Sequence, residues 1–315
     1  DGLIYYTPVY RDYLLKILGA QSLGRLVLEG DRVIGVMPLL SKNGPYGIVI
    51  NSLPFFGSNG GVLAETEEAE MMLYNEYETL ASACGVALSV WISHPFREAP
   101  SFSNVYMDQR ISQWTDLTVD SVGGLPGAID STSRRNIRKA ASCGVLVREA
   151  PDALDFLEDV HQQNMKAIGG RAKPHEFFTY LPEIMTYERD WRLYLAERYD
   201  EKLAALLTFQ AATTVEYVMP VVLDSARGLQ PTAAILSRAM HDAKMQGYTR
   251  WNWGGTWLTQ EGVYRFKKKW GAKERRYNYF ITLNDPSLLL LTASELSAAY
   301  SWFYTLPYHL LTRGF

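Results

Sequence analysis

The sequence predicts an α/β protein with two lobes of one type, each a mixed sheet covered by helices. Three observations support this prediction. At 315 residues the chain is longer than one ordinary domain. Two stretches, residues 25–93 and 192–255, repeat the order strand, turn, strand, strand, loop, helix, strand. The helix of each stretch is expected to end at a glycine, Gly85 in the first and Gly247 in the second.

The first copy reads as strands of apolar residues separated by turn residues, followed by a helix and a buried strand. Its expected elements are, in order, a strand–turn–strand pair (25–40), an apolar segment (47–57), a glycine-rich loop (58–61), a helix (65–84) and a strand (86–93).

The second copy has the same order, and its third strand alternates apolar and other residues as a half-buried strand does. Its expected elements are a strand–turn–strand pair (192–210), a strand (215–222), a Gly/Pro loop (224–231), a helix (232–246) and a strand (248–255).

Further elements are expected between and after the two copies. A basic helix over 131–144 is capped by Asp130 or Ser131, and a long helix over 151–170 has Pro151 in its first turn. Residues 260–285 read as a short helix, a turn and a strand, and the tail begins as an apolar helix. We therefore predict a first lobe over 1–115, a second lobe over 116–285 that carries the donor site, and a tail over 286–315.

Composition narrows the class of protein. Hydrophobic residues make up 47% of the chain and charged residues 21%, which is typical of a soluble protein with a sizeable core. The net charge of −3 argues against DNA binding by an overall basic field. Only two cysteines occur, too few for a disulfide framework, which favours a reducing cytoplasm. No apolar run is long enough to cross a bilayer, so we expect a cytoplasmic protein, with a peripheral position at the inner membrane face left open.

The common catalytic signatures are missing. We find no nucleophile elbow, P-loop or dinucleotide fingerprint, and no pair among the five histidines has the spacing of zinc ligands. The lack of these motifs argues against a metal-dependent enzyme, an enzyme with a covalent intermediate or a tightly bound cofactor.

One candidate site is the loop that precedes the helix of the second copy. A loop that ends at a helix N-terminus offers free N–H groups and a positive dipole end to phosphate. Arg227, Gly228 and Thr232 are the candidate residues for binding a donor phosphate. A plain turn before a core helix is the alternative interpretation of this segment.

The second candidate is the lysine run 267–269, which lies between Phe266 and Trp270. Most charge runs are solvated helix faces. Neighbouring helical residues point about 100° apart, however, so one lysine can turn inward while another faces water. Flanking aromatic rings would then remove water from the inward ammonium and strengthen its attraction to an oxyanion.

Three sequence motifs resemble those of one family. The strand WNWGG (251–255), followed by GVYRFK (262–267) and WG (270–271), resembles the C-terminal signature of the Fem peptidoglycan aminoacyltransferases. The segment RRNIRKA (134–140) with Gly144 resembles the basic helix that opens the second lobe of these proteins. SLPF (52–55) with Gly60 and Gly61 resembles a segment of the Fem-related branch associated with exopolysaccharide systems.

The resemblance implies tandem lobes of the acyl-CoA N-acyltransferase (GNAT) fold, with the C-terminal tail packing on the first lobe. It implies transfer of an aminoacyl or acyl group from aminoacyl-tRNA or acyl-CoA to an amine of a cell-wall or polysaccharide precursor. Lys267 matches the lysine that lies near the acyl-transfer site in this family. We assign the substrate groove to Trp253, Trp257, Phe266 and Arg135.

Two departures from the family pattern matter. The coiled-coil arm of longer members is missing, and the coenzyme A loop lacks the full Q/R-x-x-G-x-G/A pattern. We expect direct transfer, in which Lys267 and backbone N–H groups of a splayed strand near 218–221 stabilise a tetrahedral oxyanion. Glu261 and Tyr264 are candidates for proton transfer. An acetyl-CoA-dependent N-acetyltransferase and a non-catalytic binding protein remain as alternatives.

Overall fold

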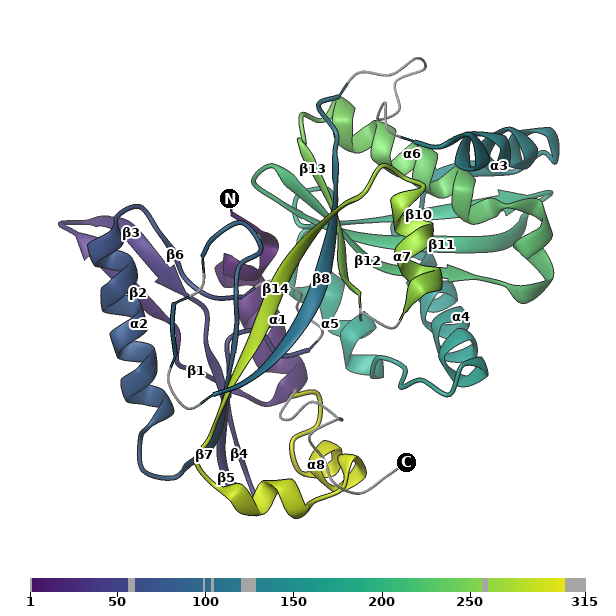
Figure 1. Cartoon of the computed structure of the whole chain (residues 1–315). Helices are drawn as coiled ribbons and strands as arrows, with labels where there is room; N and C mark the ends of the chain where they lie inside the picture. Colours follow the sequence, from purple (N-terminus) through teal and green to yellow (C-terminus); the bar gives the residue numbers. More distant parts are fainter. Residues whose placement is uncertain are drawn as a thin grey trace. The chain divides into compact units, whose positions relative to one another are not determined.

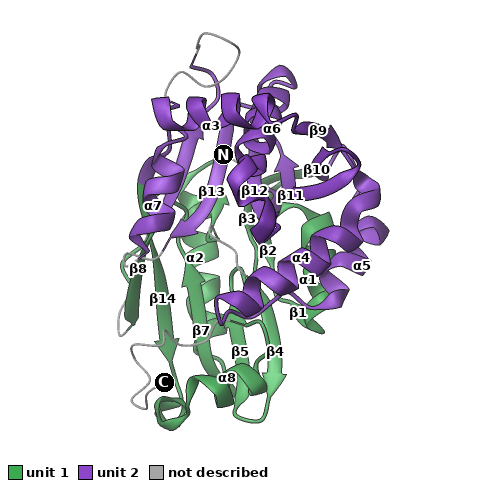
Figure 2. Cartoon of the chain, turned by 90° about the vertical axis from the view of Figure 1, so that its right-hand side faces the viewer, with its two compact units in different colours: residues 1, 5–111, 275–315 green, residues 2–4, 112–274 purple. Residues whose placement is uncertain are grey.

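The chain divides into two compact units, which Figure 2 shows in different colours. The structure, a computed structural model, describes residues 2–55, 60–98, 100–102, 105–119, 129–256 and 260–303. Unit 1 consists mainly of Tyr5–Ile111 and Arg275–Phe315, and unit 2 mainly of Ser112–Glu274.

Unit 1 contains strands of two sheets. In the larger one the strands of this unit follow the order β1-β4-β5-β7-β14-β8, and the smaller one has the order β2-β3-β6. The strands are β1 (Gln21–Ser22), β2 (Arg25–Glu29), β3 (Arg32–Met37), β4 (Leu40–Gly44), β5 (Gly47–Asn51), β6 (Leu63–Ala64), β7 (Val86–Ile92), β8 (Tyr106–Asp116) and β14 (Lys273–Leu283). β8 and β14 each begin in one unit and end in the other.

The helices of unit 1 follow their capping signals. α1 begins after Thr7, whose hydroxyl accepts from the Tyr10 N–H, and α2 begins after Thr66 in the same way. The helices are η1 (Ile4–Tyr6), α1 (Pro8–Leu18), α2 (Glu67–Ala81), η4 (Pro286–Leu290) and α8 (Ala293–Ala299). α2 packs on the small sheet, and residues of both form one apolar core with Trp91 of β7.

The described part of the tail, up to residue 303, contacts unit 1. The Tyr300 hydroxyl donates to the Gly47 carbonyl at 3.0 Å, and the Phe55 N–H donates to the Trp302 carbonyl at 3.0 Å. A side chain at Gly44 would overlap the Tyr300 ring, so glycine is required there.

Unit 2 contributes strands in the order β8-β13-β12-β11-β10-β9. The strands not yet given are β9 (Leu146–Glu149), β10 (Trp191–Arg198), β11 (Glu201–Ala211), β12 (Thr214–Val222) and β13 (Arg250–Thr256). β9 to β12 pair antiparallel, and β13 pairs parallel with β12. α6 therefore serves as the crossover between two parallel strands.

Helices cover both faces of the unit 2 strands. They are α3 (Ser131–Ser142), η2 (Pro151–Ala153), α4 (Leu154–Ala167), α5 (His175–Ile184), η3 (Asp224–Leu229), α6 (Pro231–Met245) and α7 (Glu261–Lys268). α6 packs against α3 and against β10, β11 and β12, while α4 packs on β11 and β12 from the other side (Figure 1). Tyr194 and Ala196 of β10 enter the core under α6, as period-two alternation requires.

The mixed α/β fold and the predicted element order are confirmed, with one difference between the copies. In both, two parallel strands enclose a helix: β5 and β7 around α2, and β12 and β13 around α6. The long strand β11 of the second copy corresponds to two short strands in the first, β3 and β4, which belong to different sheets. Pro38 lies between β3 and β4, and its missing N–H explains why no single strand continues there.

None of the helices in the described ranges has both the length and the apolar character that a bilayer span requires.

Candidate active site

The candidate site lies at the carboxyl ends of β12 and β13. The parallel pairing of these strands runs from Thr214↔Arg250 to Glu216↔Asn252, although both strands continue beyond it. The β11–β12 register also shifts, because Leu207 pairs with Met219 and the next residue pairs with Tyr217. The strands therefore part where β12 bulges, and ligands of α/β sheets bind outside the carboxyl ends of such strands.

Buried polar contacts fix the end of β13. The Asn252 side chain donates to Glu216 Oε2 at 2.6 Å and accepts the Gly254 N–H at 2.9 Å. Gly254 has φ +72°, in the left-handed region that favours glycine. The carbonyls that follow are turned toward α7 by this conformation.

Lys267 of α7 reaches these groups. Its side chain is only 4% exposed. The ammonium donates to Thr256 Oγ1 at 2.8 Å and to the Gly255 carbonyl at 3.1 Å. The Gly254 carbonyl lies 3.5 Å away, which is long for a hydrogen bond, so one ammonium proton is held only weakly.

Gln113 connects Thr256 to α7 through two hydrogen bonds. The Thr256 hydroxyl donates to Gln113 Oε1 at 3.0 Å, and Gln113 Nε2 donates to the Tyr264 carbonyl at 3.1 Å. Gln113 of β8 and Thr256 of β13 are both buried. Because each group has a partner, the position of the Lys267 ammonium is well defined.

Burial lowers the pKa of Lys267 to about 8, because removal from water disfavours the charged amine. Near neutral pH the side chain is still mostly an ammonium ion and can donate to an oxyanion. Lys268 and Lys269 are exposed, as the helical step between neighbours predicts. The Lys267 side chain is thus the buried member of the lysine run.

Aromatic side chains line the same region. Trp253 Nε1 donates to Thr115 Oγ1 at 2.9 Å, and that hydroxyl donates to the Trp270 carbonyl at 2.9 Å. The Trp253 ring lies 6.1 Å from the Phe266 ring and 6.4 Å from the Trp270 ring, between centroids. Trp270 is 2% exposed, but Phe266 is 36% exposed, so only one of the two rings expected to pack inward is fully buried.

The predicted phosphate loop forms η3 and leads into α6. Gln230 precedes α6 with φ +60° and gives no side-chain cap. Pro231 has no N–H and the Ala233 N–H donates to the Gln230 carbonyl at 3.0 Å, so the Thr232 N–H is the candidate first-turn donor to a ligand. Arg227 is exposed and pairs with Asp224 at 2.8 Å. A side chain at Gly228 would meet open space, and Thr232 is half-buried in the first turn. Because β12 and β13 are parallel, this loop lies at the same sheet edge as Gly254.

The side chains of other predicted site residues contact different groups or solvent. Glu261 is exposed and pairs with Arg265 at 2.6 Å. The Tyr264 hydroxyl donates to Glu274 at 2.9 Å, and this hydrogen bond raises the tyrosine pKa. Arg135 is exposed on α3. Trp257 lies outside the described residues.

The structure adds four site residues that sequence reasoning missed: Gln113, Thr256, Asn252 and Glu216. Isolated polar residues in strands look like ordinary solvent-facing positions, so no local signal separates them from a sheet surface. Among the described residues, no group of three or more His, Cys, Asp or Glu is arranged to hold a metal ion.

Comparison with known proteins finds similarity to an acetyltransferase family model and to solved structures of the same fold. Residues 130–268, which contain α3, the phosphate loop and Lys267, match the family model described as acetyltransferase (GNAT) domain. Among curated proteins, no sequence match was found.

Solved structures similar to the chain extend the likeness over both units. A crystal structure of FemX has a TM-score of 0.71 at 14% identity, covering 91% of this chain and 94% of that one. The C-terminal domain of a putative lysylphosphatidylglycerol synthetase from Agrobacterium fabrum has a TM-score of 0.62 at 12% identity, covering 94% of each chain. A tandem GNAT protein from the clavulanic acid biosynthesis pathway has a TM-score of 0.51 at 13% identity, covering 87% of each chain.

Proposed function

We propose that this chain, a GNAT acyltransferase with a Fem-like fold, transfers an aminoacyl or acyl group from an activated ester or thioester to an amine of a cell-envelope or polysaccharide precursor. The observation that carries the proposal is the buried Lys267 ammonium, held at the end of β13 by Thr256 and the Gly255 carbonyl. It lies within the segment that matches the acetyltransferase model.

The reaction is a direct transfer. The nitrogen of a neutral amine attacks the carbonyl carbon of the donor, forming a C–N bond and placing negative charge on the carbonyl oxygen. The tetrahedral intermediate then expels the alcohol or thiol of the donor as the C–O or C–S bond breaks. The amine loses one proton, and the leaving group gains one, so the products are an amide and a free alcohol or thiol.

Lys267 acts on the charge that develops in this step. An ammonium in a site shielded from water stabilises an oxyanion by about 3–4 kcal/mol, by analogy with other oxyanion donors. The weakly held proton that faces Gly254 is the one available to the oxyanion. N–H groups near the bulge of β12 would share that charge.

The first turn of α6 and Arg227 would hold a phosphate of the donor. An uncapped helix N-terminus and a nearby guanidinium both attract phosphate oxygens. Aminoacyl-tRNA and acyl-CoA both carry an activated acyl group next to phosphates, so both are candidate donors. The similarity to FemX favours a cell-wall precursor as the acceptor.

A donor and acceptor screen tests the proposal. The purified chain is incubated with charged total tRNA or with a set of acyl-CoA thioesters. Each donor is combined with UDP-linked muropeptides or amino sugars, and products are identified by mass spectrometry. We expect one amide product that requires the protein and is lost in Lys267→Met but kept in Lys269→Met.

Two results would overturn the proposal. Binding of a donor without any transfer would identify a non-catalytic binding protein. Acetyl transfer from acetyl-CoA exclusively to amines outside the cell-envelope and polysaccharide precursors would identify an N-acetyltransferase of another kind.

A further inference from the structure

Asn164 lies on the side of α4 that faces the sheet. The buried residues Leu157, Val160 and His161 come seven, four and three positions before it, so all four share one helix face. A polar side chain on such a face needs hydrogen-bond partners. Asn164 Nδ2 donates to the Val222 carbonyl at 3.0 Å, and the Val222 N–H donates to Asn164 Oδ1 at 3.2 Å. One side chain therefore bonds both backbone groups of a residue near the end of β12.

The two backbone groups of Val222 point away from β11. The Leu223 N–H donates to the Leu203 carbonyl at 3.0 Å, and the next pair along the ladder is Val222 with Ala204. Hydrogen-bonded and non-hydrogen-bonded pairs alternate along an antiparallel ladder, so Val222 directs its N–H and carbonyl to the opposite edge of β12. Pro220, two residues earlier, faces the same edge, where its missing N–H costs no ladder bond. This is the edge that β13 pairs with nearer the start of β12.

β13, which ends at Thr256 in the described chain, does not reach Val222. Its parallel pairing with β12 runs as far as Glu216 and Asn252, and the same register would place the partner of Val222 beyond Thr256. Asn164 therefore bonds β12 where a neighbouring strand would, since its amide offers the same donor and acceptor as a peptide group. The stretch of β12 between Glu216 and Val222 is thus held at each end by an asparagine amide.

The Asn164 contact lies directly before the phosphate loop. η3 begins at Asp224, two residues after Val222, and leads into α6. Val222 is held from α4 and Leu223 from β11, so the backbone that enters the loop is fixed from two sides. Arg227 lies in this loop, so the direction in which the chain leaves β12 determines where its guanidinium stands.

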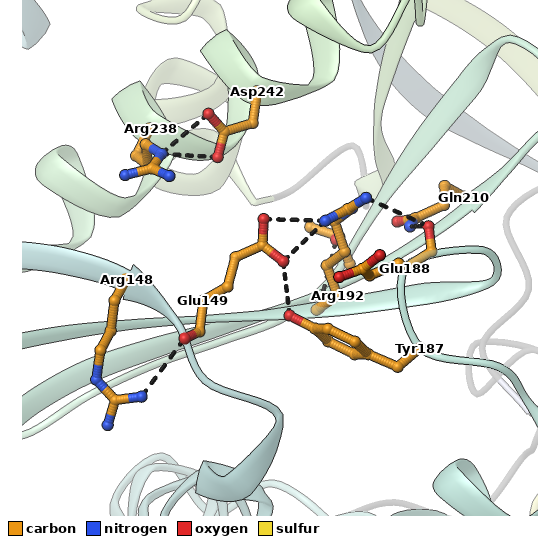
Figure 3. A network of polar contacts seen from close by, with 9 residues as sticks. Arg148, Glu149, Tyr187, Glu188, Arg192, Gln210, Arg238 and Asp242 are labelled. Atoms are coloured by element: carbon orange, nitrogen blue, oxygen red, sulfur yellow. Dashed lines mark hydrogen bonds and ion pairs between the residues drawn. The ribbon is translucent and has the colours of Figure 1, made fainter.

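Another edge of the unit 2 sheet is supported by side chains alone. Figure 3 shows Glu149 of β9 accepting from Arg192 of β10 at 2.8 Å and from the Tyr187 hydroxyl at 2.6 Å. The backbones of β9 and β10 also pair with each other, so the strands keep their conformation without these bonds. Asn164 differs because it bonds a strand backbone on an edge that no described strand reaches at that point.

We propose that Asn164 is a positioning residue for donor binding: its amide takes the place of a strand at the end of β12 and fixes the backbone from which the phosphate loop starts. The proposal rests on the acyl transfer proposed above and holds for any activated donor that carries phosphate. Asn164 acts through Val222 and the loop rather than by contact with the reacting atoms. A carboxylate in its place would lack the donor, and an apolar side chain would lack both groups.

Hydrogen exchange of the full chain measures the contact itself. In Asn164→Leu, which keeps a side chain of similar size, amides in peptides covering residues 219–230 should exchange about tenfold faster, since the Val222 N–H loses its acceptor. Gln163→Ala removes an exposed amide from the same helix, and Tyr187→Phe removes a hydrogen bond of the network in Figure 3. Both controls should leave these peptides unchanged, and thermal melting verifies folding of each protein.

Donor kinetics separate positioning from a general loss of stability. With the donor that the product screen identifies, Asn164→Leu should raise the KM for donor about five- to tenfold and change kcat less than about twofold, because a misplaced loop weakens ground state and transition state alike. A loss of folded protein would instead lower the apparent kcat and leave KM unchanged. Gln163→Ala and Tyr187→Phe should keep both constants within about twofold of the wild type.

Three results would overturn the proposal. They are unchanged hydrogen exchange in Asn164→Leu, faster exchange with an unchanged donor KM, and an equal rise of KM in Tyr187→Phe. Failure of the proposed function is a different result, because no donor would then yield a product. Calorimetry with coenzyme A as the probe decides in that case. Asn164→Leu should bind it about three- to tenfold more weakly than the wild type, and equal affinity, or no binding by the wild type, would refute the positioning role.

Discussion

Lys267 Nζ lies 2.8 Å from Thr256 Oγ1, so a cation near the end of α7 is held by the last residue of β13. The Thr256 hydroxyl accepts a hydrogen bond from the ammonium and donates one to Gln113 Oε1, so the orientation of its O–H bond is defined. Each contact involves a buried group, and the described acceptors of the ammonium are one hydroxyl and two backbone carbonyls rather than a carboxylate.

Thr256→Val tests whether this hydroxyl supports the charge on Lys267. Valine lacks the hydroxyl that is the nearest acceptor of the ammonium, and its loss destabilises the charged form. The pKa of Lys267 should therefore fall below its present value of about 8. Turnover at pH 7 should drop roughly tenfold, and the decline of kcat at high pH should begin earlier. Thr256→Ser keeps the hydroxyl and should retain the wild-type dependence of kcat on pH. Identical pH dependence in the valine and serine variants would show that the Thr256 hydroxyl does not support the ammonium.

The pH dependence of turnover should report Lys267 itself. Lys267 donates only when protonated, so its contribution is present below pH 8 and is lost as pH rises through that value. Turnover in the wild type should therefore decline above about pH 8, whereas Lys267→Met should show a low rate that rises as the amine substrate deprotonates. A wild-type rate that climbs steadily to pH 10 would contradict the assignment.

Gly254→Ala, compared with Gly144→Ala, distinguishes the loss of unfolding free energy caused by backbone strain from the loss of turnover caused by a changed site. Gly254 and Gly144 have φ values of +72° and +74°, and a side chain at either would meet open space. Alanine in this region costs about 1–2 kcal/mol, so both variants should lose similar unfolding free energy in urea. Only Gly254→Ala should also reduce turnover, because it moves the carbonyls that hold Lys267. Equal turnover in the two variants would argue against a role for this turn.

Thr115→Val tests the two hydrogen bonds that Thr115 makes with Trp253 and Trp270. The change leaves Trp253 Nε1 without its acceptor and the Trp270 carbonyl without its donor, and both lie in buried surroundings. We expect a loss of about 2 kcal/mol in unfolding free energy, measured by chemical denaturation. Thr118→Val, at an exposed position, should cost less than about 0.5 kcal/mol. A smaller loss at Thr115 than at Thr118 would show that these contacts carry little energy.

Arg227→Ala tests the phosphate loop. With coenzyme A as the probe in calorimetry, binding at low salt should weaken about three- to tenfold, and the difference should shrink as salt screens this exposed charge. Arg238→Ala removes another paired arginine, from the helix α6 that follows this loop, and should leave the affinity unchanged. Unchanged affinity in Arg227→Ala at low salt would exclude this residue from donor binding.

Local sequence patterns were sufficient for the elements that carry the fold. Glycines at the helix ends and apolar alternation located α2, α6 and the strands around them, and the step between neighbouring lysines predicted that one would turn inward. The inward lysine is the one that the motif RFKKKWG selects, Lys267.

Long-range pairing set the limit of prediction. Gln113 and Thr256 are 143 residues apart, and only the placement of β8 next to β13 in the sheet brings them together. A buried glutamine in a strand has the same local pattern as an exposed one. The elements α1, α5, β8 and β9 were also not predicted. For α1 the local signals are present, Thr7 before Pro8 at the start and Gly19 after Leu18 at the end.

The turnover of Lys267→Met, measured beside Lys269→Met, tests the central claim most directly. With the donor and acceptor that the product screen identifies, kcat of Lys267→Met should fall about 10²- to 10³-fold while KM changes little, since the lost interaction is made in the transition state. Lys269 is exposed, so Lys269→Met should keep nearly full turnover. A Lys267→Met protein that folds normally and turns over like the wild type, or that changes only KM, would contradict the claim that this ammonium stabilises the oxyanion.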